Sequence, residues 1–292
     1  METPRLICAA PAKINLYLHV TARRDDGYHL LDSLVCFANV HDTVTLAPAD
    51  NLTLHIDGPS AGPLLNAGDN LVLKVARTLA EAAGIAPRAE IRLNKRLPVA
   101  SGMGGGSSDA AATLSGLCRL WGLSLATDDL MALALGLGAD VPVCLYGKAA
   151  FIGGIGEDIA PAPPLPPCSI VLVNCGDSLS TPAVFAARDS PFSVVGRFDS
   201  SPANATELAA LLATRDNDLY LAAARLMPAI PDSLKAIGKT NGVLLSRMTG
   251  SGATCFGLYA TPGEATAAAL KLSGEHPEWW VEAAVLKGDV TD

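Results

Sequence analysis

The chain has 292 residues, of which half are hydrophobic and 17% are charged, and its formal net charge is −8 at pH 7. This length and apolar content fit two folded domains and exclude extensive disorder. The acidic balance excludes a general nucleic-acid-binding surface, so any anionic ligand must be held by local groups.

The seven cysteines form no C-x-x-C pair, which argues against a disulfide framework and against a zinc site. No apolar run approaches the roughly 18 residues that a membrane span needs. The N-terminal segment, interrupted by Lys13 and Asn15, is typical of a strand rather than of a signal peptide. We therefore expect a cytoplasmic protein with neither a membrane nor a nucleic acid as its partner.

Alternating and helical patterns organise the first half of the chain. The predicted strands cover residues 5–20, 41–48, 51–58 and 89–98, with a turn at "RRDDGY", residues 23–28. The predicted helices cover residues 69–84, 107–122 and 127–138. The first of them starts at an Asp-Asn cap and ends at Gly84, and the third is also expected to be capped.

In the second half, strands are predicted on both sides of the proline-rich turn "APAPPLPP". A short helix at "TPAVFAARDS" precedes an irregular segment, residues 190–206, and then two or three small helices that end near Gly238. The last elements are predicted as strand, strand, helix and strand, at residues 242–250, 255–261, 262–275 and 279–286. This order favours an α+β architecture.

The stretch "LPVASGMGGGSSDAAATL", residues 97–114, is neither a Walker A loop nor a Rossmann fingerprint. It still follows a strand and leads into a helix, so glycine backbone and free helical N–H groups can face an anion. Ser107 and Ser108 add hydroxyls for phosphate or metal. The alternative is a plain loop that Ser107 caps, with Asp109 in the first helical turn, and both remain open at this point.

Three more segments contain unusual polar residues. In "PAKINLYLHV", Lys13 and Asn15 fall on one face of an apolar strand. In "LGADVPVCLYG", Asp140 lies between a helix end and an expected strand, as a helix terminator or as a functional acid. In "MTGSGATCFGLY", a second Gly/Ser/Thr turn lies between two strands.

These segments together resemble the three motifs of the GHMP kinases. With "DGYHLLDSL" and "STPAVF", they are similar to the subfamily that phosphorylates 4-diphosphocytidyl-2-C-methyl-D-erythritol, over residues 8–288. The resemblance implies an α+β, two-domain GHMP kinase fold with its active site in the interdomain cleft. It implies a ribosomal protein S5 domain 2-like ATP-binding domain at residues 1–160 and a ferredoxin-like domain at residues 161–292.

The resemblance also implies the roles of the motif residues in phosphoryl transfer. Asp140 would be the general base on the substrate hydroxyl, and Lys13 would keep it ionised and polarise that hydroxyl. The competing interpretation is a structural ion pair without proton transfer. The residues implied in holding the ATP phosphates are Pro98, Val99, Ala100, Ser101, Gly102, Met103, Gly104, Gly105, Gly106, Ser107 and Ser108.

For the acceptor substrate, the resemblance implies that Tyr28 and Phe185 stack on opposite faces of the cytosine and that His29 bonds its edge. Asn15 would contact the methylerythritol hydroxyls. The same subfamily motifs add Thr181, and the turn at residues 249–252 would shape the phosphate and substrate side of the cleft. Mg²⁺ is expected to arrive with ATP, with its protein ligands unknown and Ser107 and Ser108 only as candidates. Asp109 is expected to cap the helix rather than to bind metal.

The implied activity is ATP-dependent phosphorylation of the 2-hydroxyl of 4-diphosphocytidyl-2-C-methyl-D-erythritol, in the non-mevalonate route to isoprenoid precursors. Another GHMP kinase, for homoserine or a mevalonate derivative, would not need the base pocket of Tyr28, His29 and Phe185. A non-catalytic nucleotide sensor would not need Lys13 and Asp140. The acidic charge disfavours a glycine-rich nucleic-acid binder.

Overall fold

The computed structural model describes residues 5–65, 70–176 and 178–290. The chain forms two compact units, neither of them continuous in sequence. Unit 1 comprises Met1–Ala12, His41–Val99 and Gly105–Tyr146, and unit 2 comprises Lys13–Val40, Ala100–Gly104 and Gly147–Asp292. The glycine-rich loop therefore contributes residues to both units. The domain boundary expected after residue 160 stays a prediction.

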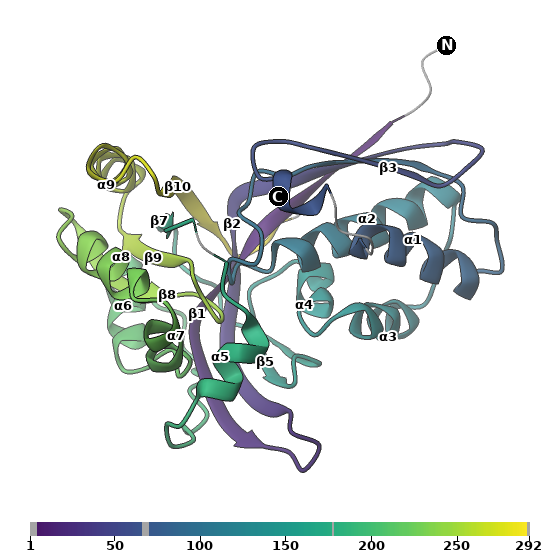
Figure 1. Ribbon diagram of the computed structural model, residues 1–292. Coiled ribbons are helices and arrows are strands. Elements are labelled where there is room, and N and C mark those ends of the chain that lie inside the picture. The colour runs from purple at the N-terminus through teal and green to yellow at the C-terminus, as the bar shows by residue number, and fades with distance from the viewer. Residues whose placement is uncertain (1–4, 66–69, 177, 291–292) are drawn as a thin grey trace. The chain divides into compact units, whose positions relative to one another are not determined.

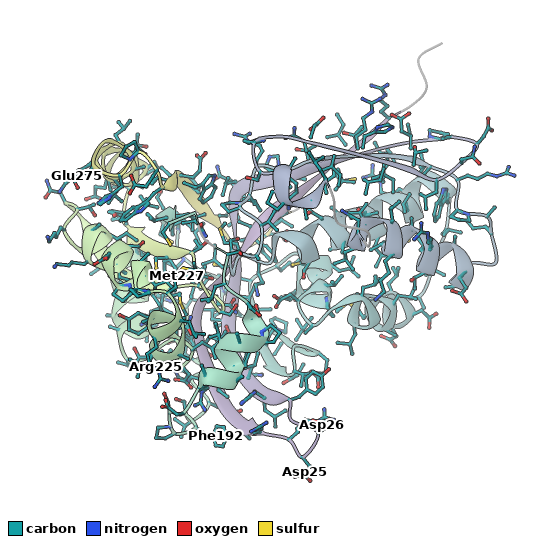
Figure 2. The ribbon with its side chains drawn as sticks, in the orientation of Figure 1. Asp25, Asp26, Phe192, Arg225, Met227 and Glu275 are labelled. Atoms are coloured by element: carbon teal, nitrogen blue, oxygen red, sulfur yellow. The ribbon has the colours of Figure 1, made fainter. Side chains whose placement is uncertain are left out.

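The first two strands, β1 (Leu6–Arg23) and β2 (His29–Ala47), are long and joined by a hairpin. The predicted turn is confirmed: Gly27 has φ +91°, and the Gly27 N–H donates to the Arg24 carbonyl at 3.0 Å. Figure 2 shows Asp25 and Asp26 at the tip of this hairpin. Only the second half of β2 was predicted, because its first half is buried on successive positions and lacks polar alternation.

In unit 1, β4 (Glu90–Asn94) pairs in parallel with β3 (Thr53–Asp57) and antiparallel with the second half of β2. A 3₁₀ turn, Gly62–Leu64, follows β3. Figure 1 shows the helices of this unit gathered together. They are α1 (Leu71–Ala82), α2 (Gly105–Trp121), α3 (Thr127–Leu137) and α4 (Val141–Tyr146). Their apolar faces and the inner faces of β2 and β4 share one buried core.

The ends of two helices test the predicted caps. The Asn70 side chain accepts a hydrogen bond from the Val72 N–H at 2.9 Å, which confirms the cap of α1. The cap predicted for α3 is wrong, because Ala126 occupies the N-cap position and Thr127 is already helical. In α3, Asp128 and Asp129 in the first turn supply the favourable negative charge instead.

The segment after Asp140 is a helix, α4, and not the expected strand. Pro142 is its second residue, a position where a missing N–H costs nothing. Val141 and Val143 are buried, and α4 packs against α2. This tertiary packing overrides the preference of valine for strands, which is only a weak local signal.

In unit 2, four antiparallel strands run in the order β10, β7, β9 and β8. Their bounds are Trp280–Lys287, Ser169–Asn174, Cys255–Tyr259 and Val243–Met248. β10 also pairs with the first half of β2, which pairs in turn with the hairpin of β5 (Ala150–Gly154) and β6 (Asp158–Pro161).

The helices of unit 2 lie beside these strands (Figure 1). They are α5 (Thr181–Ala187), α6 (Ala205–Ala213), α7 (Tyr220–Leu226), α8 (Ala229–Gly238) and α9 (Pro262–Glu275). Helix α9 packs on β7 and β10, and α8 packs on β8 and β9. The predicted α+β character, the irregular segment before α6 and the three small helices are confirmed.

Two expectations drawn from composition concern the whole chain. Within residues 5–65, 70–176 and 178–290, no helix is both long and apolar enough to span a bilayer. All seven cysteines lie in these ranges, and none of them forms a disulfide there. Burial raises the pKa of the Cys168 thiol to about 12, so that thiol remains protonated at neutral pH.

Candidate active site

The glycine-rich loop has a backbone that few residue types can adopt. Ala100, Gly102 and Gly104 have φ of +52°, +78° and +61°. Helix α2 then begins at Gly105, two residues earlier than predicted. The first turn of α2 therefore lies inside the glycine motif, and its unbonded N–H groups and positive dipole end can receive an anion.

The first-turn residues differ in how accessible they are. Gly106 is exposed, and no atom lies within 4 Å of the position that its Cβ would take. Ser108 is only 2% exposed, and its Oγ donates to the Pro11 carbonyl at 2.7 Å. Ser107 is half-buried. Of the two serine hydroxyls, Ser107 is the better placed to meet a ligand, because that of Ser108 is engaged within the fold.

The prediction that Asp109 caps α2 is wrong. Because α2 starts at Gly105, Asp109 is its fifth residue and lies on the buried face, 3% exposed. Its Oδ2 is 2.7 Å from the Lys95 Nζ, and the Asp42 Oδ2 is 2.5 Å from the same nitrogen. We call these three residues the Asp42–Lys95–Asp109 cluster.

Sequence reasoning missed this cluster because its members are far apart in the chain. Lys95, just after β4, is 53 residues from Asp42 in β2 and 14 residues from Asp109 in α2. The only local signal was Lys95 itself, which continues the core-facing side of the strand beyond Leu93. Burial raises the pKa of Asp109 to about 7, although the Lys95 charge opposes this shift. Burial lowers the pKa of Lys95, but Asp109 and Asp42 outweigh burial and raise it overall.

Residues 100–104 pack against the third motif at backbone distance. A Cβ on Gly102 would lie 2.6 Å from the Gly252 carbonyl oxygen and 2.7 Å from that of Thr249. A Cβ on Gly250 would likewise overlap the Gly102 carbonyl oxygen. The Thr254 N–H donates to the Ser101 carbonyl at 3.1 Å. The two glycine turns that the sequence singled out therefore form one packed structure within unit 2.

Strand β1 places Lys13 and Asn15 beside both turns. The Lys13 N–H donates to the Met103 carbonyl at 2.9 Å, and the Lys13 side chain lies 3.2 Å from the Cβ position of Gly104. The Asn15 N–H donates to the Thr249 Oγ1, and the Asn15 Nδ2 donates to the Ser33 Oγ, both at 2.8 Å. The Asn15 Oδ1 is buried and accepts no hydrogen bond from the described residues.

Helix α5 connects the third motif to the β1–β2 hairpin. Thr181 and Phe185 are four residues apart and thus share one face of α5. The hydroxyl oxygens of Thr181 and Ser251 are 2.7 Å apart, within hydrogen-bond distance. The Phe185 ring stacks on the His29 ring, with centroids 5.1 Å apart and planes at 29°. The structure thus brings together all of the predicted substrate residues of unit 2 except Tyr28.

The aromatic residues do not form the expected arrangement, in which Tyr28 and Phe185 would face each other across a base. Tyr28 is 61% exposed, and it is His29 that faces Phe185. Burial, followed by the charges of Arg23 and Arg188, lowers the pKa of His29. His29 is therefore neutral at pH 7 and offers one N–H donor and one nitrogen acceptor. The roles of Tyr28, His29 and Phe185 stay predictions.

Asp140 is half-buried at the start of α4, where its carbonyl accepts a hydrogen bond from the Cys144 N–H at 3.2 Å. A helix N-terminus favours a negative side chain. Asp140 belongs to unit 1 and Lys13 to unit 2. Their expected roles as base and cation stay predictions.

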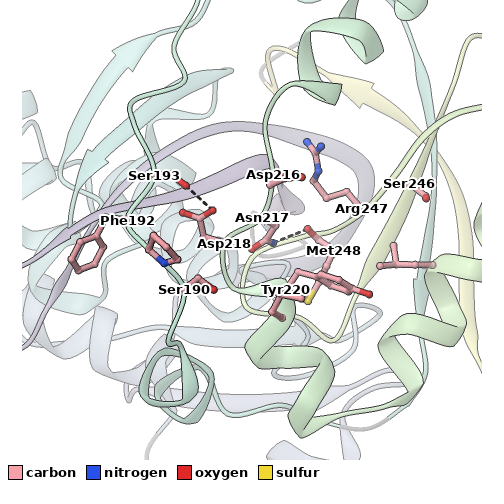
Figure 3. Close-up of a pocket in the computed structure, with 13 residues that line it drawn as sticks. Ser190, Phe192, Ser193, Asp216, Asn217, Asp218, Tyr220, Ser246, Arg247 and Met248 are labelled. Atoms are coloured by element: carbon pink, nitrogen blue, oxygen red, sulfur yellow. Dashed lines mark hydrogen bonds between the residues drawn. The ribbon is translucent and has the colours of Figure 1, made fainter.

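A pocket of about 620 Å³ in unit 2 contains none of the predicted site residues (Figure 3). Asp216 and Asp218 line it, and the Arg247 guanidinium donates to the carbonyls of Leu16, Leu212 and Arg215. Carboxylates repel phosphates, so this pocket does not suit ATP or another nucleotide. Its residue Asn217 donates to the Met248 and Gly250 carbonyls, both at 2.8 Å, and so holds the backbone of the third motif in place.

Comparison with known proteins identifies the family. The GHMP kinases N terminal domain matches residues 70–148, and the GHMP kinases C terminal domain matches residues 200–278. A 4-diphosphocytidyl-2-C-methyl-D-erythritol kinase from Paramagnetospirillum magneticum is 53% identical over 95% of this chain and 97% of its own. The chain belongs to the GHMP kinases, in the 4-diphosphocytidyl-2-C-methyl-D-erythritol kinase family.

Solved structures agree with the assignment of this chain to the GHMP kinases. A crystal structure of a 4-(cytidine 5'-diphospho)-2C-methyl-D-erythritol kinase has a TM-score of 0.78 and 34% identity, covering 97% of this chain and all of its own. Homoserine kinase from Cytophaga hutchinsonii has a TM-score of 0.71 at 19% identity, covering 98% and 96% of the two chains. The second likeness concerns the fold alone. The predicted GHMP kinase fold is confirmed.

Replacing Gly102 with alanine should destabilise the kinase, whereas replacing Gly106 should not. At Gly102 the new Cβ meets backbone atoms and φ is positive, which costs at least about 2 kcal/mol of unfolding free energy. At Gly106 the space is open and φ is not positive, so alanine is neutral or stabilises α2. Thermal unfolding of Gly102→Ala and Gly106→Ala checks this, and equal midpoints would contradict the packing described.

Replacing Asp109 with asparagine should stabilise the kinase at alkaline pH. The folded-state pKa of about 7 lies above the ordinary value of 3.8 for an aspartate, so ionising Asp109 destabilises the folded state as pH rises through the folded-state pKa. Asparagine does not ionise. The thermal midpoint of Asp109→Asn should exceed that of the wild type at about pH 8, with a smaller gap at about pH 5.

The exposed Asp50 supplies the control for this comparison. The difference in thermal midpoint between Asp50→Asn and the wild type should not depend on pH. An Asp109→Asn variant that is less stable than the wild type at alkaline pH would mean that the ion pair with Lys95 outweighs the cost of burial.

Proposed function

We propose that this GHMP kinase transfers the γ-phosphoryl group of ATP to the 2-hydroxyl of 4-diphosphocytidyl-2-C-methyl-D-erythritol, in the non-mevalonate route to isoprenoid precursors. The observation that carries the proposal is the 53% identity to a kinase of that name over 95% of the chain. Solved homoserine and mevalonate kinases are less similar, for example at 19% and 16% identity, and that likeness concerns the fold alone. The cytoplasmic location and the absence of a nucleic-acid partner stay predictions.

The ATP phosphates are assigned to the glycine-rich loop and the first turn of α2. The open space over Gly106, the half-buried Ser107 and the positive φ values at residues 100, 102 and 104 support this assignment. Phosphate oxygens bind well to unbonded N–H groups at a helix N-terminus. The remaining loop residues shape the cradle, since several pack against the third motif rather than facing solvent.

Mg²⁺ would be held mainly by the ATP phosphates and by water. Among the described residues, no three His, Cys, Asp or Glu side chains converge on one point. The Ser108 hydroxyl donates to the Pro11 carbonyl, and Asp109 pairs with Lys95. Of the residues considered, this leaves the Ser107 hydroxyl as the candidate protein ligand for Mg²⁺. Mg²⁺ keeps several waters and needs few protein ligands, so this sparse donor set suits it. The ion would neutralise developing phosphate charge.

Asp140 is assigned as the base and Lys13 as the cation that supports it. The substrate oxygen attacks the γ-phosphorus as its proton passes to Asp140, the bond to the β–γ bridging oxygen breaks, and ADP leaves. Lys13 is 3% exposed in β1 beside Gly104, so its charge acts in a medium of low dielectric constant. Positioning and charge neutralisation account for most of the catalysis in such a transfer.

The acceptor substrate is assigned to unit 2 residues. The buried Asn15 Oδ1 lacks a donor, and a methylerythritol hydroxyl would supply one. The neutral His29 has the donor and acceptor that the edge of cytosine requires. Phe185 presents a ring for stacking, at the end of the α5 face that carries Thr181.

Replacing Asp140 with asparagine should lower kcat by roughly 10²–10⁴-fold, because the acceptor hydroxyl loses its base. Steady-state phosphorylation of the cytidine substrate by wild type and Asp140→Asn measures this, with thermal unfolding to confirm that the variant is folded. The control Asp128→Asn alters an exposed carboxylate of the same unit. Equal rates in wild type and Asp140→Asn would support the structural ion pair instead, and an inactive wild type would refute the proposed function.

Replacing Phe185 with leucine should raise KM for the cytidine substrate by about tenfold, since aromatic stacking on a base is worth about 1–3 kcal/mol. KM for ATP should not change. Phe192→Leu is the matched control, because Phe192 is also in unit 2 and is 52% exposed. A wild type that phosphorylates methylerythritol phosphate, without the cytidine group, equally well would contradict the base pocket.

A further inference from the structure

The Asp42–Lys95–Asp109 cluster is more deeply buried than a charged group ordinarily is. Lys95 and Asp42 side chains are 2% and 0% exposed, and that of Asp109 is 4% exposed. With both carboxylates ionised, one ammonium faces two negative charges. A buried ion pair is seldom the most stable choice for a protein core, because the cost of desolvation can exceed the Coulomb attraction. A gain in overall stability therefore does not account for this arrangement.

The position of the cluster relates it to the glycine-rich loop. The Asp42 Oδ1 accepts hydrogen bonds from the Arg96 and Leu97 N–H groups, at 2.6 and 2.9 Å, directly before the loop. At the other end, the Cβ position of Gly105 is 3.4 Å from the Lys95 Nζ and 3.6 Å from the Asp42 Oδ2. The cluster is thus bonded to the backbone where the loop leaves β4, and it lies beside Gly105, where the loop becomes α2.

The hydrogen bonding of Asp109 is incomplete. Its Oδ2 is bonded to Lys95, but its Oδ1 is buried and accepts no hydrogen bond from the described part of the chain. A pair selected only for stability would bond both oxygens, because a buried acceptor without a donor is costly. The link from Asp109 to Lys95 nevertheless joins α2 to the segment at the start of the loop.

Lys95 does not have the geometry of a phosphate-binding lysine. Its Nζ lies 2.5 Å from one carboxylate and 2.7 Å from another, and the side chain is 2% exposed. Two carboxylates already neutralise its charge, so a phosphate would gain little from it. A role in ATP binding would therefore have to act through the backbone beside the cluster and not through direct contact with a phosphate.

We propose that Asp42, Lys95 and Asp109 are positioning residues that set the spacing between the end of β4 and the first turn of α2, and thereby the affinity for ATP. The proposal rests on the proposed function, since it takes the loop as the site of the ATP phosphates. Lys95 links the two carboxylates, Asp42 holds the start of the loop, and Asp109 holds α2.

The decisive variant is Asp109→Leu, because it removes the link to α2 and leaves the Lys95–Asp42 pair intact. KM for ATP should rise about tenfold, the effect of losing one charged hydrogen bond, while kcat and KM for the cytidine substrate change by less than about twofold. Asp109→Asn retains an oxygen acceptor for Lys95 and should restore most of the ATP affinity. Asp50→Leu, at an exposed position of the same unit, is the control.

Calorimetric binding of a non-hydrolysable ATP analogue to the full chain should show the same order of affinities, independently of turnover. If Asp109→Leu does not fold, the triple variant Asp42→Asn, Lys95→Met, Asp109→Leu removes all three buried charges, while an asparagine Oδ1 at position 42 can still accept from the Arg96 and Leu97 N–H groups. It should give the same loss of affinity. Unchanged analogue affinity in a folded variant would overturn the proposal. So would a lower kcat with every KM unchanged, which marks a merely structural role.

The two proposals fail in different ways. A wild type that binds the analogue but phosphorylates no cytidine substrate refutes the function, while the analogue affinities still decide the role of the cluster. A wild type with kinase activity and an Asp109→Leu variant with unchanged ATP affinity refutes the role of the cluster alone.

Discussion

The arrangement of the candidate site depends on close backbone contacts at the glycines of its loop, above all at Gly102 and Gly104. Gly102 lies against the Thr249 and Gly252 carbonyls, Gly104 lies over the Lys13 side chain, and Gly105 lies over the Lys95 ammonium. At Gly102 a Cβ would overlap backbone, and at Gly104 it would press on the Lys13 side chain, whereas at Gly105 it would make an ordinary contact with Lys95. The absence of side chains at Gly102 and Gly104 therefore allows the loop to come close to the third motif and to Lys13.

This close approach is consistent with the proposed binding of ATP phosphates by a chain whose net charge is −8. In the proposed assignment, the positive charge for the phosphates is local and comes from the first turn of α2 and from Lys13 in β1. Lys95 is a third cation near the motif, but Asp42 and Asp109 neutralise it. The two proposals therefore give the buried lysines different roles, Lys13 as a charge and Lys95 as a structural link.

Local sequence patterns predicted most elements but failed where the tertiary structure changed the context. Asn70 caps α1 as expected, because a cap depends only on residues adjacent in sequence. Asp109 was misassigned because the start of α2 depends on the glycine backbone before it. The helix α4 was predicted as a strand because local residue preferences do not reveal that its valines pack on α2. The clustering of Asn15 with Thr249 depends likewise on contacts 234 residues apart.

The sequence by itself determined the family, the α+β fold and the identity of the glycine, lysine and acid motifs, because these depend on residue type and order. Only the tertiary structure determined which of these residues meet: Gly102 with Gly252, Asn15 with Thr249, and Phe185 with His29. It alone revealed the pairing of Lys95 with Asp42 and Asp109. Ion pairs between distant residues leave no periodic signal, since they form only when the folded backbone brings the charges together.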